Sequence, residues 1–80
     1  MRRLTAAELT SPDAWAQLLG ARVTLRYRLH GDAGHPFSEA AGVVRAVAHG
    51  EEGPDCVEIV TRRGDVRRVP LGDVVAAKAL

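Results

Sequence analysis

Three histidines and a single cysteine are the side chains of this sequence best suited to hold a metal ion: His30, His35, His49 and Cys56. Zinc sites are usually built from closely spaced pairs such as Cys-x-x-Cys or His-x₃-His, because two ligands on one short segment fix the geometry at little entropic cost. No such pair is present. We therefore predict no metal site and no cofactor, and we interpret Cys56 as a small hydrophobic residue at the start of a strand.

Nucleophilic catalysis would require a serine or cysteine that is brought together with a histidine and a carboxylate. The available nucleophiles are Ser11, Ser38 and Cys56, and nothing in their local sequence activates any of them. The sequence therefore predicts no catalytic residues, and we expect a protein that is not an enzyme.

Arginine supplies ten of the eleven basic residues, and two groups could contact the phosphates of a nucleic acid: Arg22 and Arg26, and Arg62, Arg63, Arg67 and Arg68. If both groups share one surface, they form a basic patch of the kind with which small barrels bind RNA or single-stranded DNA. Such sites also use exposed aromatic side chains, and here Trp15 and Tyr27 fall on apolar faces. The net charge is only +1, and cross-strand ion pairs, such as Glu58 with an opposing arginine, explain the same pattern as a solvated face.

Eighty residues, of which 46% are hydrophobic, suit one small domain with a compact aliphatic core. The single cysteine excludes an internal disulfide, which agrees with a reducing cytoplasm. The segment after Met1-Arg2-Arg3 lacks the apolar run of a secretory signal, and no stretch has the ~18 apolar residues of a membrane span. We expect a cytoplasmic protein without membrane insertion.

Residues 12–19 are expected to form a helix, because Ser11 is a preferred N-cap and Pro12 suits the first helical position. Gly20 can end this helix in a left-handed conformation. At helical spacing one face carries the apolar residues Trp15, Leu18 and Leu19. So short a helix is unstable alone, so we expect this face to pack on the rest of the chain or on another chain. Upstream, Thr5-x-x-Glu8 has the spacing of a capping box.

The pattern then changes from helical spacing to strict alternation, and residues 22–29 give the clearest strand signal. Further strands are expected at about 41–48, 56–62, 66–69 and 74–78. Between them lie a loop at 30–39, an acidic turn at 49–55, a hairpin turn at 63–65 and a 3₁₀ corner at 70–73. Short strands joined by turns predict a mainly β protein: a five-stranded SH3-like small barrel at residues 21–80, behind a short N-terminal α-helical extension at residues 1–20.

Two segments resemble a known module. Residues 20–29 are similar to the first strand, and Val60 to Pro70 with the closure Asp73-Val74-Val75-Ala76-Ala77-Lys78 is similar to the last hairpin and closing strand, of the SH3-like module that precedes the catalytic domain in actinobacterial GNAT-type acetyltransferases. The resemblance implies an SH3-like barrel, here expected to stand alone without the catalytic domain, so acetyl transfer is not implied. Arg28-x-x-Gly31-x-Ala33 matches the pyrophosphate pattern of those enzymes, and we interpret it as a strand that runs into a loop.

Our first hypothesis is a non-enzymatic protein-interaction or regulatory accessory module that binds a protein partner or a second copy of itself. The candidate contact residues are Trp15, His35, Phe37, Glu51 and Glu52. The alternative is a barrel that binds RNA or single-stranded DNA through the arginines named above. In size and fold class the chain is also similar to the iron-transport accessory proteins of the FeoA type, which is a further alternative.

Overall fold

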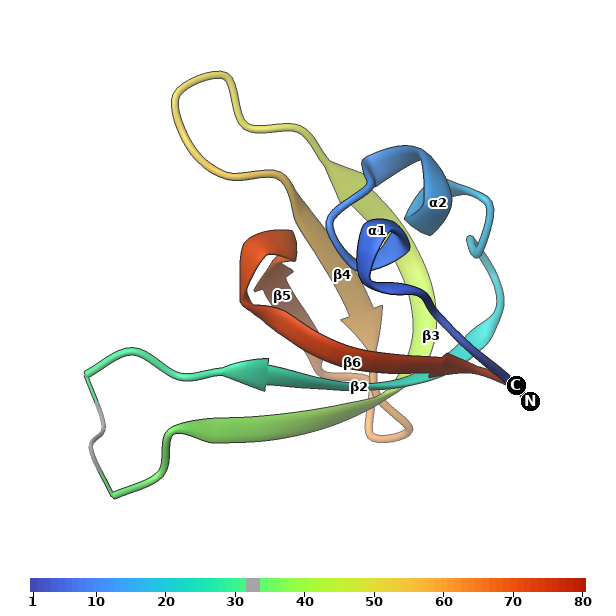
Figure 1. Ribbon diagram of the computed structural model, residues 1–80. Coiled ribbons are helices and arrows are strands. Elements are labelled where there is room, and N and C mark those ends of the chain that lie inside the picture. The colour runs from blue at the N-terminus through green and yellow to red at the C-terminus, as the bar shows by residue number, and fades with distance from the viewer. Residues whose placement is uncertain (32–33) are drawn as a thin grey trace.

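An antiparallel sheet of six strands forms the body of the protein in the computed structural model (Figure 1). The structure describes residues 1–31 and 34–80, so residues 32 and 33 of the predicted loop and of the Arg28-x-x-Gly31-x-Ala33 pattern lie outside the described residues. The strands are β1 (Arg2–Arg3), β2 (Arg22–Arg28), β3 (Phe37–Ala48), β4 (Cys56–Val60), β5 (Val66–Pro70) and β6 (Val74–Ala79). Their order in the sheet is β1-β6-β2-β3-β4-β5.

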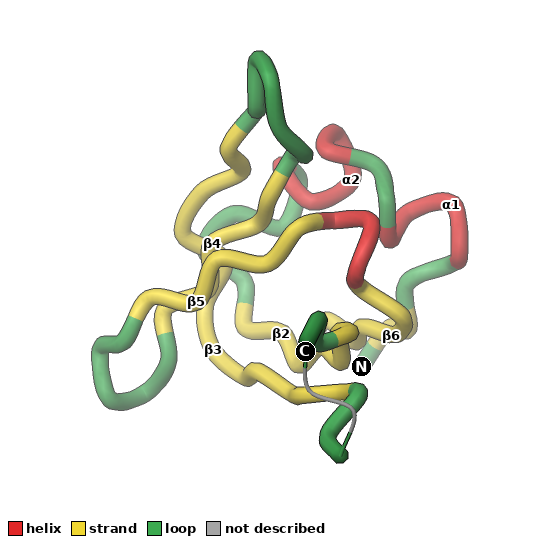
Figure 2. The backbone as a smooth tube through the Cα atoms, turned by 90° about the vertical axis from the view of Figure 1, so that its left-hand side faces the viewer, coloured by secondary structure: helices red, strands yellow, loops and turns green. Residues whose placement is uncertain are grey.

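The sheet curls around a central core, and the helices lie together at one side of it (Figure 2). The 3₁₀ helix η1 (Leu71–Asp73) forms the predicted corner between β5 and β6. The prediction of a mainly β small barrel is thereby confirmed. The chain ends meet: β1 pairs with the end of β6, which brings the N- and C-termini side by side (Figure 1).

Two strand predictions need correction. The sheet has a sixth strand, β1, which pairs with β6. Two residues are too few to show an alternating pattern, so periodicity in the sequence does not mark this strand. In addition, β3 begins at Phe37 rather than near residue 41, because Phe37 pairs with Arg28 and extends the ladder into a segment whose composition is typical of a loop.

The N-terminal segment contains two short helices instead of one: α1 (Ala6–Leu9) and α2 (Pro12–Ala16). Both predicted N-caps are present, since the side chains of Thr5 and Ser11 each accept a hydrogen bond from a backbone N–H in the first turn of the helix that follows. The two caps explain why the segment breaks into two helices, because each cap satisfies amides that a continuous helix would bond internally.

The predicted helix end at residue 19 is also corrected, because α2 ends at Ala16. Beyond it the amides bond to the third residue back, as Leu18 N–H does to the carbonyl of Trp15 at 2.9 Å. This tighter winding turns Leu19 away from the core, and it is 53% exposed, whereas Leu18 packs against the core. Gly20, at φ +82°, then leads the chain into β2.

Trp15 lies in the hydrophobic core and is 0% exposed. Its indole Nε1–H donates to the carbonyl oxygen of Leu9 at 2.9 Å. The cluster around it includes inward-facing side chains of four strands: Val23, Leu25, Val44, Val57, Ile59 and Val69. Leu4 and Leu9 of the N-terminal segment belong to the same cluster. The predicted extension 1–20 and the barrel 21–80 therefore share one core, and the helical segment docks on its own chain.

Replacing Trp15 tests whether this docking stabilises the barrel. Trp15→Ala is expected to lower the free energy of unfolding by about 3–5 kcal/mol, because it removes a fully buried aromatic side chain. Trp15→Phe should cost about 1–3 kcal/mol, since it leaves the Leu9 carbonyl without its donor. Urea unfolding measures both. Leu19→Ala, at an exposed position, is the control, and its free energy of unfolding should change by no more than about 0.5 kcal/mol. If Trp15→Ala lowers the free energy of unfolding no more than Leu19→Ala does, the central position of Trp15 is contradicted.

Candidate functional site

Cations gather on the outer face of the sheet, over β1, β6 and β2. Successive side chains of a strand point to opposite faces. Because Val23 and Leu25 are buried, the even-numbered residues of β2, which are Arg22, Thr24, Arg26 and Arg28, face outward. The ladder places Lys78 opposite Thr24, and Arg3 opposite Lys78. We define the basic face as the exposed side chains of Arg3, Arg22, Arg26, Arg28 and Lys78.

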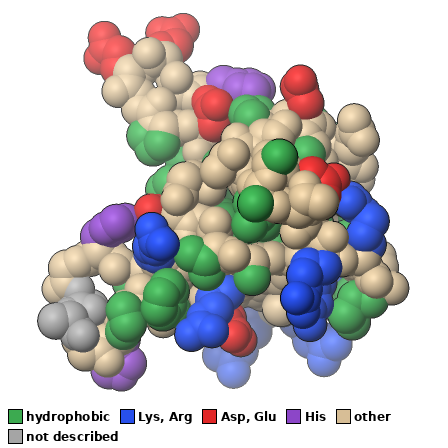
Figure 3. Space-filling model, viewed as in Figure 1, with side chains coloured by type: hydrophobic (Ala, Val, Ile, Leu, Met, Phe, Trp, Pro, Cys, Tyr) green, Lys and Arg blue, Asp and Glu red, His purple; other side chains and the backbone are tan. Residues whose placement is uncertain are grey.

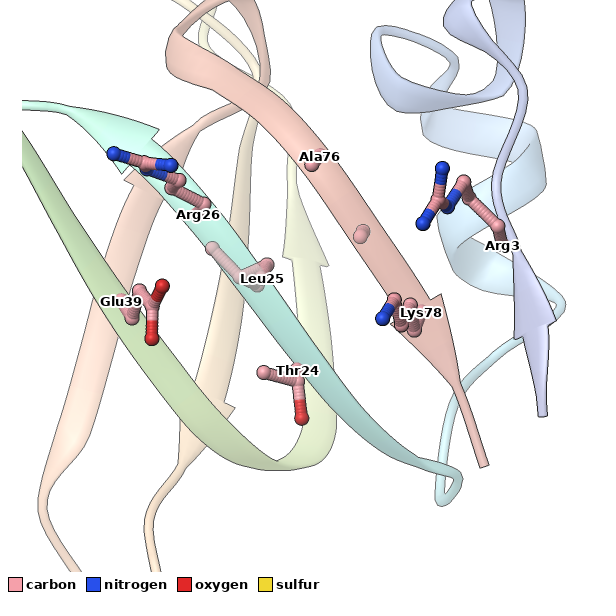
Figure 4. A pocket seen from close by; sticks show the side chains of 8 residues that line it. Arg3, Thr24, Leu25, Arg26, Glu39, Ala76 and Lys78 are labelled. Carbon is pink, nitrogen blue, oxygen red and sulfur yellow. The ribbon is translucent and has the colours of Figure 1, made fainter.

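A hollow of about 280 Å³, here called the basic groove, lies in this face between β1, β6 and β2 (Figure 4). Its polar lining consists of Arg3, Thr24, Arg26, Glu39 and Lys78. Its remaining lining residues are apolar and include the small alanines of β6. Across residues 1–31 and 34–80, the ion pairs involve none of its three cations. One carboxylate among three cations leaves the groove with a net positive charge.

Charges of opposite sign are separated on the side of the molecule that Figure 3 shows. Most of the Lys and Arg side chains in this view lie over its lower half. The upper half carries most of the Asp and Glu side chains, including those at the tip of the loop between β3 and β4, which holds the exposed Glu51 and Glu52. An anionic partner would therefore be attracted to the basic face and repelled from the opposite end.

Exposed apolar side chains lie beside the basic face, where β2 and β3 form a projecting hairpin (Figure 1). Phe37 is 40% exposed and Leu29 36%, and Leu29 N–H donates to the carbonyl of Pro36 at 2.8 Å. The guanidinium carbon of Arg26 lies 4.7 Å from the centre of the Phe37 ring, which is a cation–π contact. We call Leu29, Pro36 and Phe37 the hairpin patch.

The arginines predicted to bind nucleic acid come from several elements and do not all point to the same face of the sheet. Arg22 and Arg26 belong to the basic face, whereas Arg62 and Arg63 lie in the turn between β4 and β5. Arg67 and Arg68 are consecutive in the edge strand β5, so their side chains point to opposite faces: one lies opposite Ile59 and the other opposite Glu58. The expected ion pair of Glu58 is made with Arg45 of β3, at 3.8 Å.

Three members of the basic face were not among the predicted site residues: Arg3, Arg28 and Lys78. The alternation that identified Arg22 and Arg26 also places Arg28 on this face. Lys78 occupies the outward position of the predicted closing strand. No periodic signal could have found Arg3, because its strand is only two residues long.

The residues predicted to contact a protein partner lie in separate places. Trp15 is removed from this set, because it is fully buried in its own chain. His35 and Phe37 lie at the hairpin between β2 and β3, and both are exposed. Glu51 and Glu52 lie in the β3–β4 loop, which projects from a different part of the barrel (Figure 1).

Two of the histidines lie close to aspartate carboxylates. His30 Nε2 lies 2.8 Å from the carboxylate of Asp73 in η1, and His49 Nδ1 lies 3.6 Å from that of Asp55. Cys56 is buried, and its Sγ lies 3.6 Å from the carbonyl oxygen of Pro54. Within residues 1–31 and 34–80, no group of three or more His, Cys, Asp and Glu side chains could hold a metal ion. Among the helices of these residues, none is long and apolar enough to cross a membrane.

Contacts made by its two sequence neighbours, Arg2 and Leu4, hold Arg3 over β6. Leu4 is buried, and its N–H donates to the carbonyl of Ala77 at 2.9 Å. Arg2 Nη1 donates to both carboxylate oxygens of Glu8, at 2.9 and 3.0 Å. Glu8 also accepts from Thr5 N–H at 2.8 Å. The Thr5 N–H bond and the Arg2 guanidinium hold the pKa of Glu8 below its ordinary value.

Comparison with known proteins places this geometry in a class of small Sm-like β-barrels. The family model described as "Rv0428c N-terminal Sm-like domain" matches residues 17–78. The match covers most of the chain, and the chain therefore belongs to this family. Neither the curated proteins nor the solved structures gave a match.

The charge of Glu8 should make the stability of the N-terminal segment depend on pH. Because the folded-state pKa is lowered, the stabilisation is complete above the ordinary value of 4.5 and is lost as pH falls through the lower folded value. Glu8→Gln should therefore lower the thermal midpoint at neutral pH, and the two proteins should converge once the pH is below the lowered folded-state pKa of Glu8.

Thermal unfolding followed by circular dichroism across this range measures the effect. Glu52→Gln is the control, because it removes a carboxylate from the exposed β3–β4 loop. A difference between wild type and Glu8→Gln that stays constant with pH would contradict the role of the Glu8 charge.

Proposed function

We propose that this Sm-like barrel is a non-enzymatic interaction module that binds a protein partner and serves as an accessory or regulatory component in the cytoplasm. The family assignment supports the proposal as an analogy at the level of the fold, and the function itself is argued from the exposed site described below. The lone cysteine supports a reducing location. The resemblance of residues 20–79 to the module of GNAT-type acetyltransferases makes such a catalytic domain the first partner to test.

The observation that carries the proposal is the hairpin patch with its flanking arginines. Phe37 and Leu29 expose apolar surface on a projecting element, while Arg26 holds its guanidinium against the Phe37 ring. Aromatic and arginine side chains are the types that contribute most to binding energy at protein interfaces. We therefore place the proposed interface on the hairpin patch together with Arg26 and Arg28.

Loss of the Phe37 ring should weaken partner binding. We expect Phe37→Ser to reduce the affinity about 10-fold or more, because truncation of an interface aromatic removes well over 1 kcal/mol of binding free energy. The measurement is a titration against a GNAT-type acetyltransferase domain, with sedimentation equilibrium to detect binding to a second copy.

Val66→Ser is the matched control, since Val66 is similarly exposed, at 44%, but lies in β5. Equal effects of the two substitutions would reject the hairpin patch as the interface. If the protein shows no binding to the acetyltransferase domain and no self-association at micromolar concentration, the protein-binding function itself is rejected.

A second candidate function is binding of RNA or single-stranded DNA, and the basic face favours it. Five exposed cations lie on the same face of the sheet, with the exposed ring of Phe37 available for base stacking. The positive charge that favours this function is confined to the basic face, because the chain as a whole has a net charge of only +1.

Nucleic-acid binding predicts a salt-dependent affinity that depends on the basic face. Arg26→Glu should abolish binding of a single-stranded oligonucleotide at about 50 mM salt, as measured by fluorescence anisotropy. Arg67→Glu is the control with the same charge change, because it lies on the edge strand β5. Absence of binding by the wild-type protein, or equal loss in both variants, would reject this candidate.

A further inference from the structure

Two like charges face each other directly across β1 and β6. Arg3 and Lys78 are register partners on the outer face, and the side chains of directly opposite residues in an antiparallel pair are close neighbours. Like charges in this position are destabilising. The ion pairs formed among residues 1–31 and 34–80 include neither of them, so no carboxylate of the described chain neutralises this pair.

A third cation and a hydroxyl line the same hollow. Thr24 is the register partner of Lys78 on β2, and Arg26 lies two residues further along that strand, opposite Ala76. In Figure 4, Arg3 and Lys78 extend from β1 and β6 and Thr24 lies on β2, whereas the guanidinium of Arg26 points away from Arg3 and Lys78, in agreement with its contact with the Phe37 ring. The guanidinium of Arg3, the ammonium of Lys78 and the hydroxyl of Thr24 are donors that suit the oxygens of a phosphate group.

From this geometry we propose that the basic groove binds the phosphate group of a small phosphate monoester. The volume of about 280 Å³ accommodates a phosphate with a short substituent but not a large cofactor. Arg3 and Lys78 hold the phosphate from the β1 and β6 side and Thr24 from β2, while the side chain of Arg26 lines the edge of the groove. A bound phosphate offsets the electrostatic repulsion between Arg3 and Lys78, so the pair is unfavourable in the free protein and favourable in the complex.

Glu39 restricts the ligand further. It lines the groove and is the register partner of Arg26 on β3. A carboxylate at this rim repels a second anionic group and accepts a hydrogen bond from a hydroxyl. The ligand class is therefore a monoester whose substituent carries hydroxyl groups, such as a sugar phosphate. Arg26 borders both this site and the proposed protein interface, but Arg3, Lys78 and Thr24 lie outside that interface, so phosphate binding does not depend on the proposed protein partner.

The test uses nuclear magnetic resonance of the full chain, with inorganic phosphate, glucose 6-phosphate, uncharged glucose, sulfate and a single-stranded oligonucleotide as probes. We expect saturable shifts of the backbone amides of Thr24, Arg26, Ala76 and Lys78 with both phosphates and none with glucose. Arg3→Gln and Lys78→Gln should each weaken binding about 10-fold, because each removes a charge-assisted hydrogen bond. Arg63→Gln, in the turn between β4 and β5, is the matched control and should bind normally.

The thermal midpoint of each variant shows whether a loss of binding is due to misfolding. Lys78→Gln removes one member of the like-charge pair, so its thermal midpoint without ligand should equal or exceed that of the wild type. Phosphate should raise the midpoint of the wild type and not that of this variant. A lowered midpoint of Lys78→Gln without ligand would overturn the argument from repulsion.

Three binding results would overturn the proposal. One is the absence of saturable shifts at the groove. Another is equal binding of sulfate and both phosphates with no loss in the variants, which would indicate an adventitious ion only. The third is binding of a single-stranded oligonucleotide through Arg3 and Lys78 while the monoesters do not bind, which would assign the groove to the nucleic-acid function instead.

Discussion

The pairing of β2 on both sides, with β3 and with β6, is the constraint on which the rest of the structure depends. Val23 and Leu25 must enter the core, and this fixes the register of both ladders. A slip by one residue would carry the arginines inward and the aliphatic side chains outward. The hydrophobic core and the basic face are therefore two results of one alternating pattern, and neither can change without the other.

Local sequence patterns predicted those parts of the fold that depend on local physics. Strict alternation located β2, and the caps at Thr5 and Ser11 were read from residue type and spacing. Elements that exist because of tertiary contacts were missed. β1 forms because Leu4 is buried and anchors the chain beside β6, and β3 starts at Phe37 because β2 offers it a partner.

The candidate site also separates what local sequence patterns can predict from what only tertiary contacts determine. Proximity in the sequence suggested that Arg67 and Arg68 act together, yet strand geometry directs their side chains to opposite faces. Arg3 and Lys78 lie near opposite ends of the chain and become register partners through β1. Alternation within a predicted strand could have separated the first pair, but only the three-dimensional structure brings the second pair together.

The edge strand β5 has a consequence for the behaviour of the protein at high concentration. An unpaired edge offers backbone donors and acceptors on which strands of other molecules can add, which is a common route to aggregation. Here Pro70 lacks an N–H, and Arg67 and Arg68 would bring like charges together if two such edges met. The arginines of β5, which do not belong to the basic face, are residue types that disfavour addition of a further strand at this edge.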